Sequence, residues 1–322
     1  MNNLKHLFIC ITPLQMLIAE KIILQKKLDN CAIFLLYYHF NKKYEYYFNR
    51  LQLLCATSLK LSIKSSSKYD SLKNHFCTKE LIQNNLSSTN WSSIYLSSVD
   101  NTYVQQIVSN INFDTLITFD DGTANILPTS NYFKIQTPST FTRLKNQIFR
   151  IKYTTQSLIK CSHLHYTLYP KLNNIISQKE TIQLLSNQNT NSQKKVEQVI
   201  KIFLGQPFAE ININDKLIPK LMQLYNIAYY FPHPREATKY AECQYIESNL
   251  IFEDYLLQEL EKQTNCAYEL YSFTSTALLN ICSINMHVQC YSFFTSELKS
   301  LHPDLFTIFL EQNIKLLETE NQ

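Results

Sequence analysis

Residues 4–27, LKHLFICITPLQMLIAEKIILQKK, contain a strand pattern followed at once by a helix pattern. The first nine residues are mainly apolar and end at Thr12-Pro13. From Pro13 onward, apolar side chains recur with the spacing of one helix face. A strand that leads directly into a helix is the first part of a βαβ unit. The stretch therefore predicts a mostly parallel sheet with helices packed on it.

The same alternation continues through the first 120 residues. Strands are predicted at 30–39, 92–98 and 113–119, and helices at 41–59 and 99–112. The pattern weakens between residues 155 and 195, where the chain becomes polar and rich in Asn, Gln and Ser. Such a composition is typical of a linker or a surface excursion between domains.

The alternation begins again at residue 197. Strands are predicted at 197–205, 227–231, 266–273 and 286–293, and helices at 214–226, 252–264 and 275–283. Helical and extended segments follow at 303–320. The sequence thus predicts two α/β domains of Rossmann type, residues 1–155 and 196–322, joined by 156–195. The last helix is a candidate to pack back on the first domain.

The composition indicates a globular protein, with 45% hydrophobic and 17% charged residues. A net charge of +4 is too weak to indicate a nucleic-acid partner, but it suits anionic small ligands or an acidic membrane surface. Nine cysteines form no C-x-x-C pair, which favours reduced cysteines in the cytoplasm. No apolar run approaches 18 residues, so no membrane span is expected. We expect a cytoplasmic protein, and peripheral contact with the inner face of the cytoplasmic membrane is compatible with this expectation.

The chain contains only two glycines, Gly122 and Gly205. Average usage would give roughly twenty in a chain of this length. Glycines that persist in such a sequence are expected where a Cβ cannot be accepted, either at positive φ or where another group approaches the backbone closely.

Gly122 follows Asp120 and Asp121 at the end of the strand predicted at 113–119. Ligands of parallel α/β sheets bind outside the carboxyl ends of the strands, and repulsion between two adjacent carboxylates can raise the pKa of one toward that of a general base. A plain Asp-Gly turn is the alternative, and local sequence favours it slightly. A metal site is not predicted, because the chain has no D-x-D triplet.

Other predicted strand ends carry further candidates. Gly205 follows one strand directly, which alone is weak support for phosphate contact, since no G-x-G-x-x-G is present. His233 stands between Pro232 and Pro234, beside the permanent charge of Arg235. The fixed φ of the prolines would orient the imidazole as a general acid or phosphate ligand, and we favour this over a loop histidine without a role.

The stretch YSFTSTALLN, residues 271–280, places hydroxyls between a strand and a helix. They suit an anion site, and ordinary N-capping explains them equally well. Glu253 and Asp254 lie in the first turn of a predicted helix, where acids are favoured whatever the function.

In order and spacing, these stretches resemble the bacterial sialyltransferases of glycosyltransferase family 52, the lipooligosaccharide α-2,3-sialyltransferase family. The resemblance covers most of the chain, through residues 8–23, 41–51, 94–101, 118–126, 203–207, 232–236, 251–260 and 268–279. It implies a GT-B-like α/β fold, with two Rossmann-type domains whose parallel sheets face a central cleft. The first would be the acceptor-side domain and the second the nucleotide-binding domain.

The resemblance also implies a reaction. Family members transfer sialic acid from CMP-sialic acid to a terminal galactose with inversion and without a metal or other cofactor. The expected partners are therefore CMP-sialic acid, a galactose-terminated glycan and, since family members form dimers, a second copy of the chain. A related enzyme with another nucleotide-sugar donor, such as a glucosyltransferase, is the alternative, as is an inactive nucleotide- or glycan-binding homologue.

By resemblance, His233 acts on the leaving CMP, Ser275 and Thr276 contact the same phosphate, and Asp121 is a candidate base. In one member of the family an aspartate after the L-G-x-P stretch acts as the base. This chain has Phe208 there, and Glu210, two residues on, is the other candidate. The expected catalytic residues are His233, Asp121, Glu210 and Asp120. The expected nucleotide-binding residues are Gly205, Gln206, Pro234, Arg235, Glu253, Asp254, Ser272, Thr274, Ser275 and Thr276.

Overall fold

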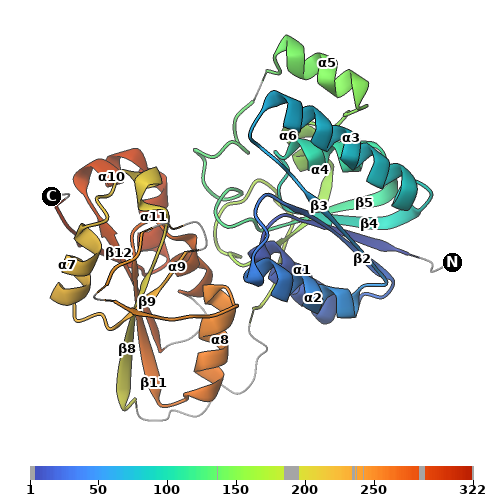
Figure 1. Cartoon of the computed structure of the whole chain (residues 1–322). Coiled ribbons are helices and arrows are strands. Elements are labelled where there is room, and N and C mark those ends of the chain that lie inside the picture. The colour runs from blue at the N-terminus through green and yellow to red at the C-terminus, as the bar shows by residue number, and fades with distance from the viewer. Residues whose placement is uncertain are drawn as a thin grey trace. The chain divides into compact units, whose positions relative to one another are not determined.

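The computed structural model describes residues 4–135, 137–184, 196–233, 236, 238–241, 243–282 and 287–320. The chain divides into two compact units, Met1–Leu184 and Leu185–Gln322. Each unit contains one parallel sheet with helices packed on it, as predicted (Figure 1). Among the described residues, no helix is long and apolar enough to cross a membrane.

The N-terminal unit is built on a seven-stranded sheet in the order β3-β2-β1-β4-β5-β6-β7, with every neighbouring pair parallel. Its strands are β1 (His6–Cys10), β2 (Cys31–Tyr37), β3 (Thr57–Ser62), β4 (Asn90–Leu96), β5 (Asn112–Phe119), β6 (Ser162–Thr167) and β7 (Lys179–Thr181). Its helices are α1 (Pro13–Lys26), α2 (Lys42–Leu54), α3 (Lys68–Asn85), α4 (Thr102–Ser109), α5 (Thr140–Ile148) and α6 (Thr155–Cys161).

The opening stretch forms the predicted strand and helix. The Thr12 side chain caps α1 by accepting a hydrogen bond from the Gln15 N–H at 3.3 Å, and Pro13 occupies the first turn, where no donor is needed. Strand β1 lies in the middle of the sheet, and Leu7, Phe8 and Ile9 are buried because helices cover both of its faces. In Figure 1, α1 and α2 lie on one face, and α3, α4 and α6 on the other.

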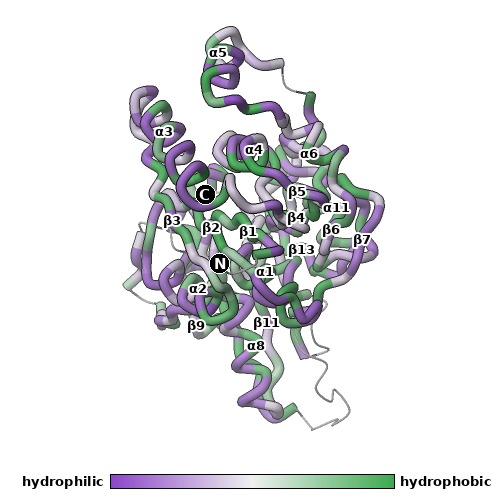
Figure 2. Tube along the Cα trace, turned by 90° about the vertical axis from the view of Figure 1, so that its right-hand side faces the viewer, coloured by the Kyte–Doolittle hydropathy of each residue, from purple (hydrophilic) through white to green (hydrophobic). Residues whose placement is uncertain are grey.

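The C-terminal unit has a six-stranded parallel sheet in the order β10-β9-β8-β11-β12-β13. Its strands are β8 (Gln198–Leu204), β9 (Tyr229–Phe231), β10 (Gln244–Tyr245), β11 (Cys266–Ser272), β12 (Val288–Phe294) and β13 (Lys315–Glu318). Its helices are the 3₁₀ helix η1 (Phe208–Ile211), α7 (Leu217–Leu224), α8 (Phe252–Lys262), α9 (Thr276–Ile281), α10 (Ser296–Leu301) and α11 (Pro303–Glu311). Figure 2 shows hydrophilic and hydrophobic segments alternating along α3 and α8, as expected of helices that cover one face of a sheet.

Two sequence predictions need correction. The predicted helix 41–59 ends at Leu54, and an edge strand, β3, begins at Thr57. The predicted linker 156–195 contains α6, β6 and β7, so the N-terminal unit continues to Leu184 rather than ending near residue 155. These late strands lie at one side of the sheet, where they are short and need fewer apolar residues than the central strands.

Candidate functional site

Each sheet has one point at which the strand order reverses direction. In the N-terminal unit this point lies between β1 and β4, and in the C-terminal unit between β8 and β11. The loops that leave adjacent strands diverge there, which opens a crevice at the carboxyl edge. The residues after these strands and their neighbours are therefore the first candidates for each unit's site.

The Asp-Asp-Gly sequence follows β5, one strand from the reversal point of the N-terminal unit. Gly122 has φ of 67°, in the left-handed region that side chains with a Cβ rarely adopt. This turn gives the two aspartates different environments: Asp120 is fully buried, whereas Asp121 stays partly exposed. The sequence analysis considered the two aspartates as one pair, but in the fold their carboxylates lie in different environments.

Asp120 is held entirely by groups of its own unit. Its Oδ1 accepts hydrogen bonds from Asn125 Nδ2 at 2.6 Å and His165 Nε2 at 2.8 Å. Its Oδ2 accepts from Thr167 Oγ1 at 3.0 Å and from the Leu168 N–H. His165 is itself buried on β6. Asp120 thus joins the turn after β5 to the end of β6, which is an arrangement suited to holding the turn in place.

Asp121 faces the reversal point and accepts hydrogen bonds from three side chains. Gln15 Nε2 lies 2.6 Å from Oδ1, Ser98 Oγ lies 2.9 Å from Oδ2, and Tyr132 OH lies 3.4 Å from Oδ2. Gln15 is fixed in turn, because its Oε1 accepts from the Ile11 N–H at 2.6 Å and its Nε2 also reaches Ser98. One carboxylate therefore connects the ends of β1, β4 and β5.

The environment of Asp121 raises the pKa of its carboxyl. Loss of bulk water is the largest cause, while the three donors act in the opposite direction and favour the ionised form. The nearby charge of Asp120 adds a smaller rise, so the expected repulsion is present but secondary. A partly exposed carboxylate with a raised pKa can accept a proton more readily than an ordinary aspartate.

Gly205 follows β8 at the reversal point of the C-terminal unit. A Cβ at this position would meet the Glu236 carboxylate, the Tyr230 hydroxyl at 2.6 Å and the His233 backbone nitrogen at 3.0 Å. The Gly205 N–H also donates to the Phe231 carbonyl at 2.9 Å. Close packing between the ends of β8 and β9 therefore explains this glycine, and positive φ explains Gly122.

Gln206 connects the loops that follow β8 and β11. Its buried side-chain oxygen accepts hydrogen bonds from Ser272 Oγ at 3.0 Å and the Thr274 N–H at 3.1 Å, and its Nε2 donates to Thr274 Oγ1 at 3.3 Å. Ser272 is also buried and lies 2.8 Å from the Leu204 carbonyl. Both residues were predicted to bind nucleotide; the structure places their side chains in contacts that hold the two loops together.

His233 lies where the sequence placed it, two residues beyond β9 and partly exposed. Its backbone N–H donates to Glu236 Oε2 at 3.3 Å, and Tyr230 OH donates to the other oxygen of that carboxylate. Burial raises the pKa of Glu236, and hydrogen bonds from Tyr230 and the His233 backbone partly offset the rise. Pro234 and Arg235 lie outside the described residues.

The hydroxyl-rich turn follows β11. Thr274, Ser275 and Thr276 are partly exposed, and Ser275 is the N-cap residue of α9. The Ser275 side chain makes no capping hydrogen bond to the described backbone of this helix. Ordinary side-chain capping, the alternative to an anion site, is therefore not observed for the Ser275 hydroxyl.

The acidic pair lies in the first turn of α8, and both residues are buried. Glu253 Oε1 accepts a hydrogen bond at 2.6 Å from Nδ2 of Asn280, which is buried on α9. Glu253 therefore connects α8 to the helix that begins with the hydroxyl-rich turn. Asp254 lies beside it on the same turn.

Phe208 directly follows the L-G-x-P stretch of residues 204–207. Its side chain is buried and packs on Phe203 and Phe273, with ring centroids 6.3 and 6.1 Å apart. Glu210, on η1, is exposed. It is therefore the surface carboxylate of this segment that lies nearest to Phe208 in the sequence. Phe208 is thus a core aromatic residue, and its side chain carries no group that could act as a base.

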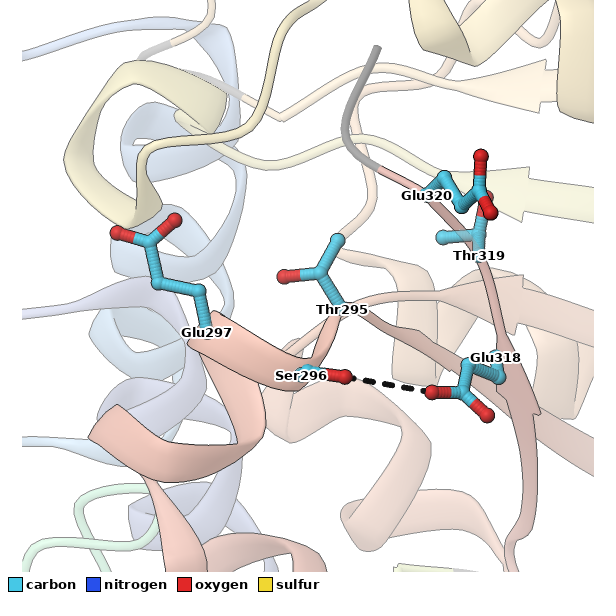
Figure 3. Close-up of a pocket in the computed structure, with 6 residues that line it drawn as sticks. All are labelled: Thr295, Ser296, Glu297, Glu318, Thr319 and Glu320. Carbon is cyan, nitrogen blue, oxygen red and sulfur yellow. Dashed lines mark hydrogen bonds between the residues drawn. The ribbon is translucent and has the colours of Figure 1, made fainter.

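A hollow of about 600 Å³ lies farther along the same edge of the C-terminal sheet (Figure 3). It is lined by Thr295, Ser296, Glu297, Glu318, Thr319 and Glu320, from the ends of β12 and β13. Its three carboxylates would repel a phosphate, which makes it unsuitable for a nucleotide. The β8–β11 edge is the better candidate for an anionic ligand.

Comparison with known proteins decides the family. The model of glycosyltransferase family 52 matches residues 29–295, which is most of the chain. The chain belongs to glycosyltransferase family 52. The family prediction and the prediction of a glycosyltransferase are therefore confirmed.

Two relatives of this glycosyltransferase align over most of their length. The CMP-N-acetylneuraminate:beta-galactoside alpha-2,3-sialyltransferase of Pasteurella multocida is 33% identical over 97% of this chain and 99% of that protein. The N-acetyllactosaminide alpha-2,3-sialyltransferase of Haemophilus influenzae is 32% identical over 86% of this chain and 88% of that protein. Among solved structures, the glycotransferase of kitacinnamycin matches with a TM-score of 0.52 and 8% identity, over 98% of this chain and 86% of the other. This likeness supports the predicted GT-B-like fold of two parallel-sheet domains.

Sequence reasoning missed several residues of this glycosyltransferase that contact the predicted ones. Gln15, Ser98 and Tyr132 surround Asp121, and Glu236 lies against Gly205. Gln15 and Ser98 do follow predicted strands, so their positions gave a signal. Tyr132 lies in an irregular segment, where no periodicity could have placed it.

Proposed function

We propose that this chain is an inverting, metal-independent sialyltransferase that transfers sialic acid from CMP-sialic acid to a terminal galactose. The observation that carries the proposal is the 33% identity, over nearly the whole chain, to a protein named as a CMP-N-acetylneuraminate:beta-galactoside alpha-2,3-sialyltransferase. The arrangement of the strand ends in both units supports it.

The C-terminal unit would bind the CMP group at the ends of β8, β9 and β11. Gly205 allows the ends of β8 and β9 to pack closely there, and Gln206 holds the two central loops in one arrangement. Thr274, Ser275 and Thr276 then present hydroxyls to the phosphate. These groups need only small movements to bind an anion, because their loops are already fixed.

Sialyl transfer builds negative charge on the departing phosphate and positive charge on the sugar. Hydroxyl and backbone donors near Ser275 would stabilise the phosphate, and His233 would donate a hydrogen bond or a proton to it. Donors fixed before the reaction are effective at this task, so a divalent cation is not needed. Arg235 would add positive charge to the same group.

Asp121 is our choice for the general base. It would take the proton from the acceptor hydroxyl as the galactose oxygen attacks the anomeric carbon from the face opposite CMP. One displacement of this kind inverts the configuration. Gln15, Ser98 and Tyr132 would hold the carboxylate in the required orientation, and Asp120 would hold the turn on which it lies. Glu210 is the alternative base.

The natural acceptor is proposed to be a lipooligosaccharide or a similar surface glycan, modified at the cytoplasmic face of the inner membrane by a homodimer. The galactosides named for the relatives and the net charge of +4 support this setting.

The proposal is tested by incubating the full chain with CMP-sialic acid and lactose, with and without EDTA. We expect release of CMP and formation of sialyllactose in both samples, and no turnover of UDP-glucose. Substitution His233→Ala should lower the transfer rate by about 10²-fold or more, the range of general acid–base catalysis. The exposed His302→Ala is the matched control and should keep the wild-type rate. Binding of CMP without transfer would contradict the proposed sialyltransferase activity. An unchanged rate in His233→Ala would contradict the role given to His233.

A further inference from the structure

Helix α5 presents an uncovered apolar stripe. Phe141, Leu144 and Ile148 follow one another at spacings of three and four residues, so they lie on one side of the helix. Their side chains are 55%, 56% and 52% exposed, and no residue of α5 is buried. In Figure 1 the helix lies at the outer end of the N-terminal unit, beyond α3, α4 and α6, and in Figure 2 it shows both hydrophobic and hydrophilic segments.

The opposite side of α5 faces the unit. Thr142, Lys145 and Asn146 are only partly exposed, and Lys145 Nζ donates a hydrogen bond at 3.1 Å to Thr102 Oγ1 at the start of α4. The polar side of the helix is thus turned inward and the apolar stripe is left outside. This is the reverse of the usual arrangement of a surface helix in a globular protein.

The segment around α5 has a one-sided charge. Residues 122–179 contain no aspartate or glutamate, although the chain as a whole has 26. The same segment contains eight cations: Lys134, Arg143, Lys145, Arg150, Lys152, Lys160, Lys171 and Lys179. Lys134, Arg143, Arg150 and Lys152 are exposed and lie within seven residues of the stripe in the sequence. An anionic partner is therefore favoured.

A short helix with an exposed apolar stripe and flanking cations matches the interfacial region of an anionic bilayer, where apolar side chains enter the acyl boundary and cations meet lipid phosphates. A second protein copy would need an acidic apolar patch to match the same surface. We propose that α5, with its flanking cations, is the surface by which this protein docks on an anionic lipid membrane. The proposed function supplies the purpose of this docking, which is to bring the enzyme to a lipid-linked acceptor; the docking surface itself is inferred from α5 and its flanking cations alone.

The test is vesicle flotation of the full chain with phosphatidylethanolamine–phosphatidylglycerol vesicles, and with phosphatidylcholine vesicles for comparison. We expect binding to the anionic vesicles alone, weakening as salt is added. The triple substitution Phe141→Ser, Leu144→Ser and Ile148→Ser should weaken binding by about 10-fold or more. The pair Arg150→Gln and Lys152→Gln should weaken it by about 5-fold for each cation removed.

A matched control replaces three exposed leucines elsewhere, Leu53→Ser, Leu224→Ser and Leu310→Ser, and should bind vesicles as the wild type does. Transfer to soluble lactose, measured on the same preparations, shows whether each variant is folded and tests the proposed function separately. Equal binding by the stripe variant and the wild type would overturn the proposal. The proposal would also be overturned if the wild type does not bind vesicles but forms a dimer, measured by light scattering, that the stripe variant cannot form.

Discussion

Removal of the Ser98 hydroxyl should shift the pH dependence of catalysis in a defined direction. Ser98 Oγ donates to Asp121 Oδ2 at 2.9 Å, and this hydrogen bond stabilises the carboxylate relative to the carboxyl group. Substitution Ser98→Ala deletes the donor while Gln15 and Tyr132 stay in place. The pKa of Asp121, already raised by burial, should therefore rise further.

The size of the shift follows from the strength of the bond. A hydrogen bond to a charged group contributes about 1.5–3 kcal/mol, and a pKa change of one unit corresponds to about 1.4 kcal/mol. Water can replace part of the lost donor, because Asp121 is partly exposed. We therefore expect a rise of about one unit. A base acts in its ionised form, so the acidic limb of the kcat/KM profile should move to higher pH by the same amount.

The assay is the pH profile of kcat/KM for transfer to lactose, recorded at constant ionic strength. The neighbouring Ser97→Ala is the matched control, since the Ser97 hydroxyl is buried and has no hydrogen-bond partner among the described residues. Its acidic limb should coincide with that of the wild type. An acidic limb in Ser98→Ala that stays in place or moves to lower pH would refute the role given to Asp121.

Three further predictions concern stability. Gly122→Asn should lower the free energy of unfolding less than Gly122→Ala does, because asparagine tolerates positive φ. At Gly205 either substitution should lower it by about 1–3 kcal/mol, because the added side chain overcrowds the site. Denaturant unfolding of the four variants measures these losses, and equal losses at the two sites would contradict the prediction. Asp120→Asn should lower the unfolding free energy by about 3 kcal/mol, because it breaks the buried hydrogen-bonded pair of Asp120 and His165. Asp121→Asn should lower the transfer rate far more than the stability. The reverse pattern would show that Asp121 is the structural residue and Asp120 the catalytic one. Burial lowers the pKa of His75 to about 4, so the folded state should lose up to about 3 kcal/mol as the pH falls from 6.5 to 4; His75→Phe should flatten that part of the stability profile, and an unchanged slope would contradict the assignment.

Much of the fold could be predicted from periodicity because the central strands are buried on both faces. Strands β1, β2 and β5 carry apolar runs bounded by polar residues or turns, and such runs are local signals. The strands β3, β6 and β7 lie toward the sides of the sheet, where partial exposure permits polar residues such as those of SHLHYT. Neighbours that are distant in sequence stabilise these strands, and local patterns do not record them.

Only part of the arrangement around the candidate residues could be predicted from the sequence. The positions of Asp121, Gly205 and His233 after strands could be predicted, because the topology places the strand ends at one edge of each sheet. The partners that give Asp121 its properties come from positions 15, 98 and 132, and no local spacing connects them. The different environments of Asp120 and Asp121 also depend on β6, which was assigned to a linker, so their separate roles could not be foreseen.

We propose that this chain transfers sialic acid from CMP-sialic acid with Asp121 as the base. The most direct measurement compares Asp121→Asn with Glu210→Gln in transfer rate and in CMP affinity, the latter by calorimetry. We predict that Asp121→Asn loses about 10²-fold or more in rate with unchanged CMP affinity, while Glu210→Gln stays within a few-fold of the wild type. Full activity in Asp121→Asn together with a large loss in Glu210→Gln would contradict the claim and place the base on η1.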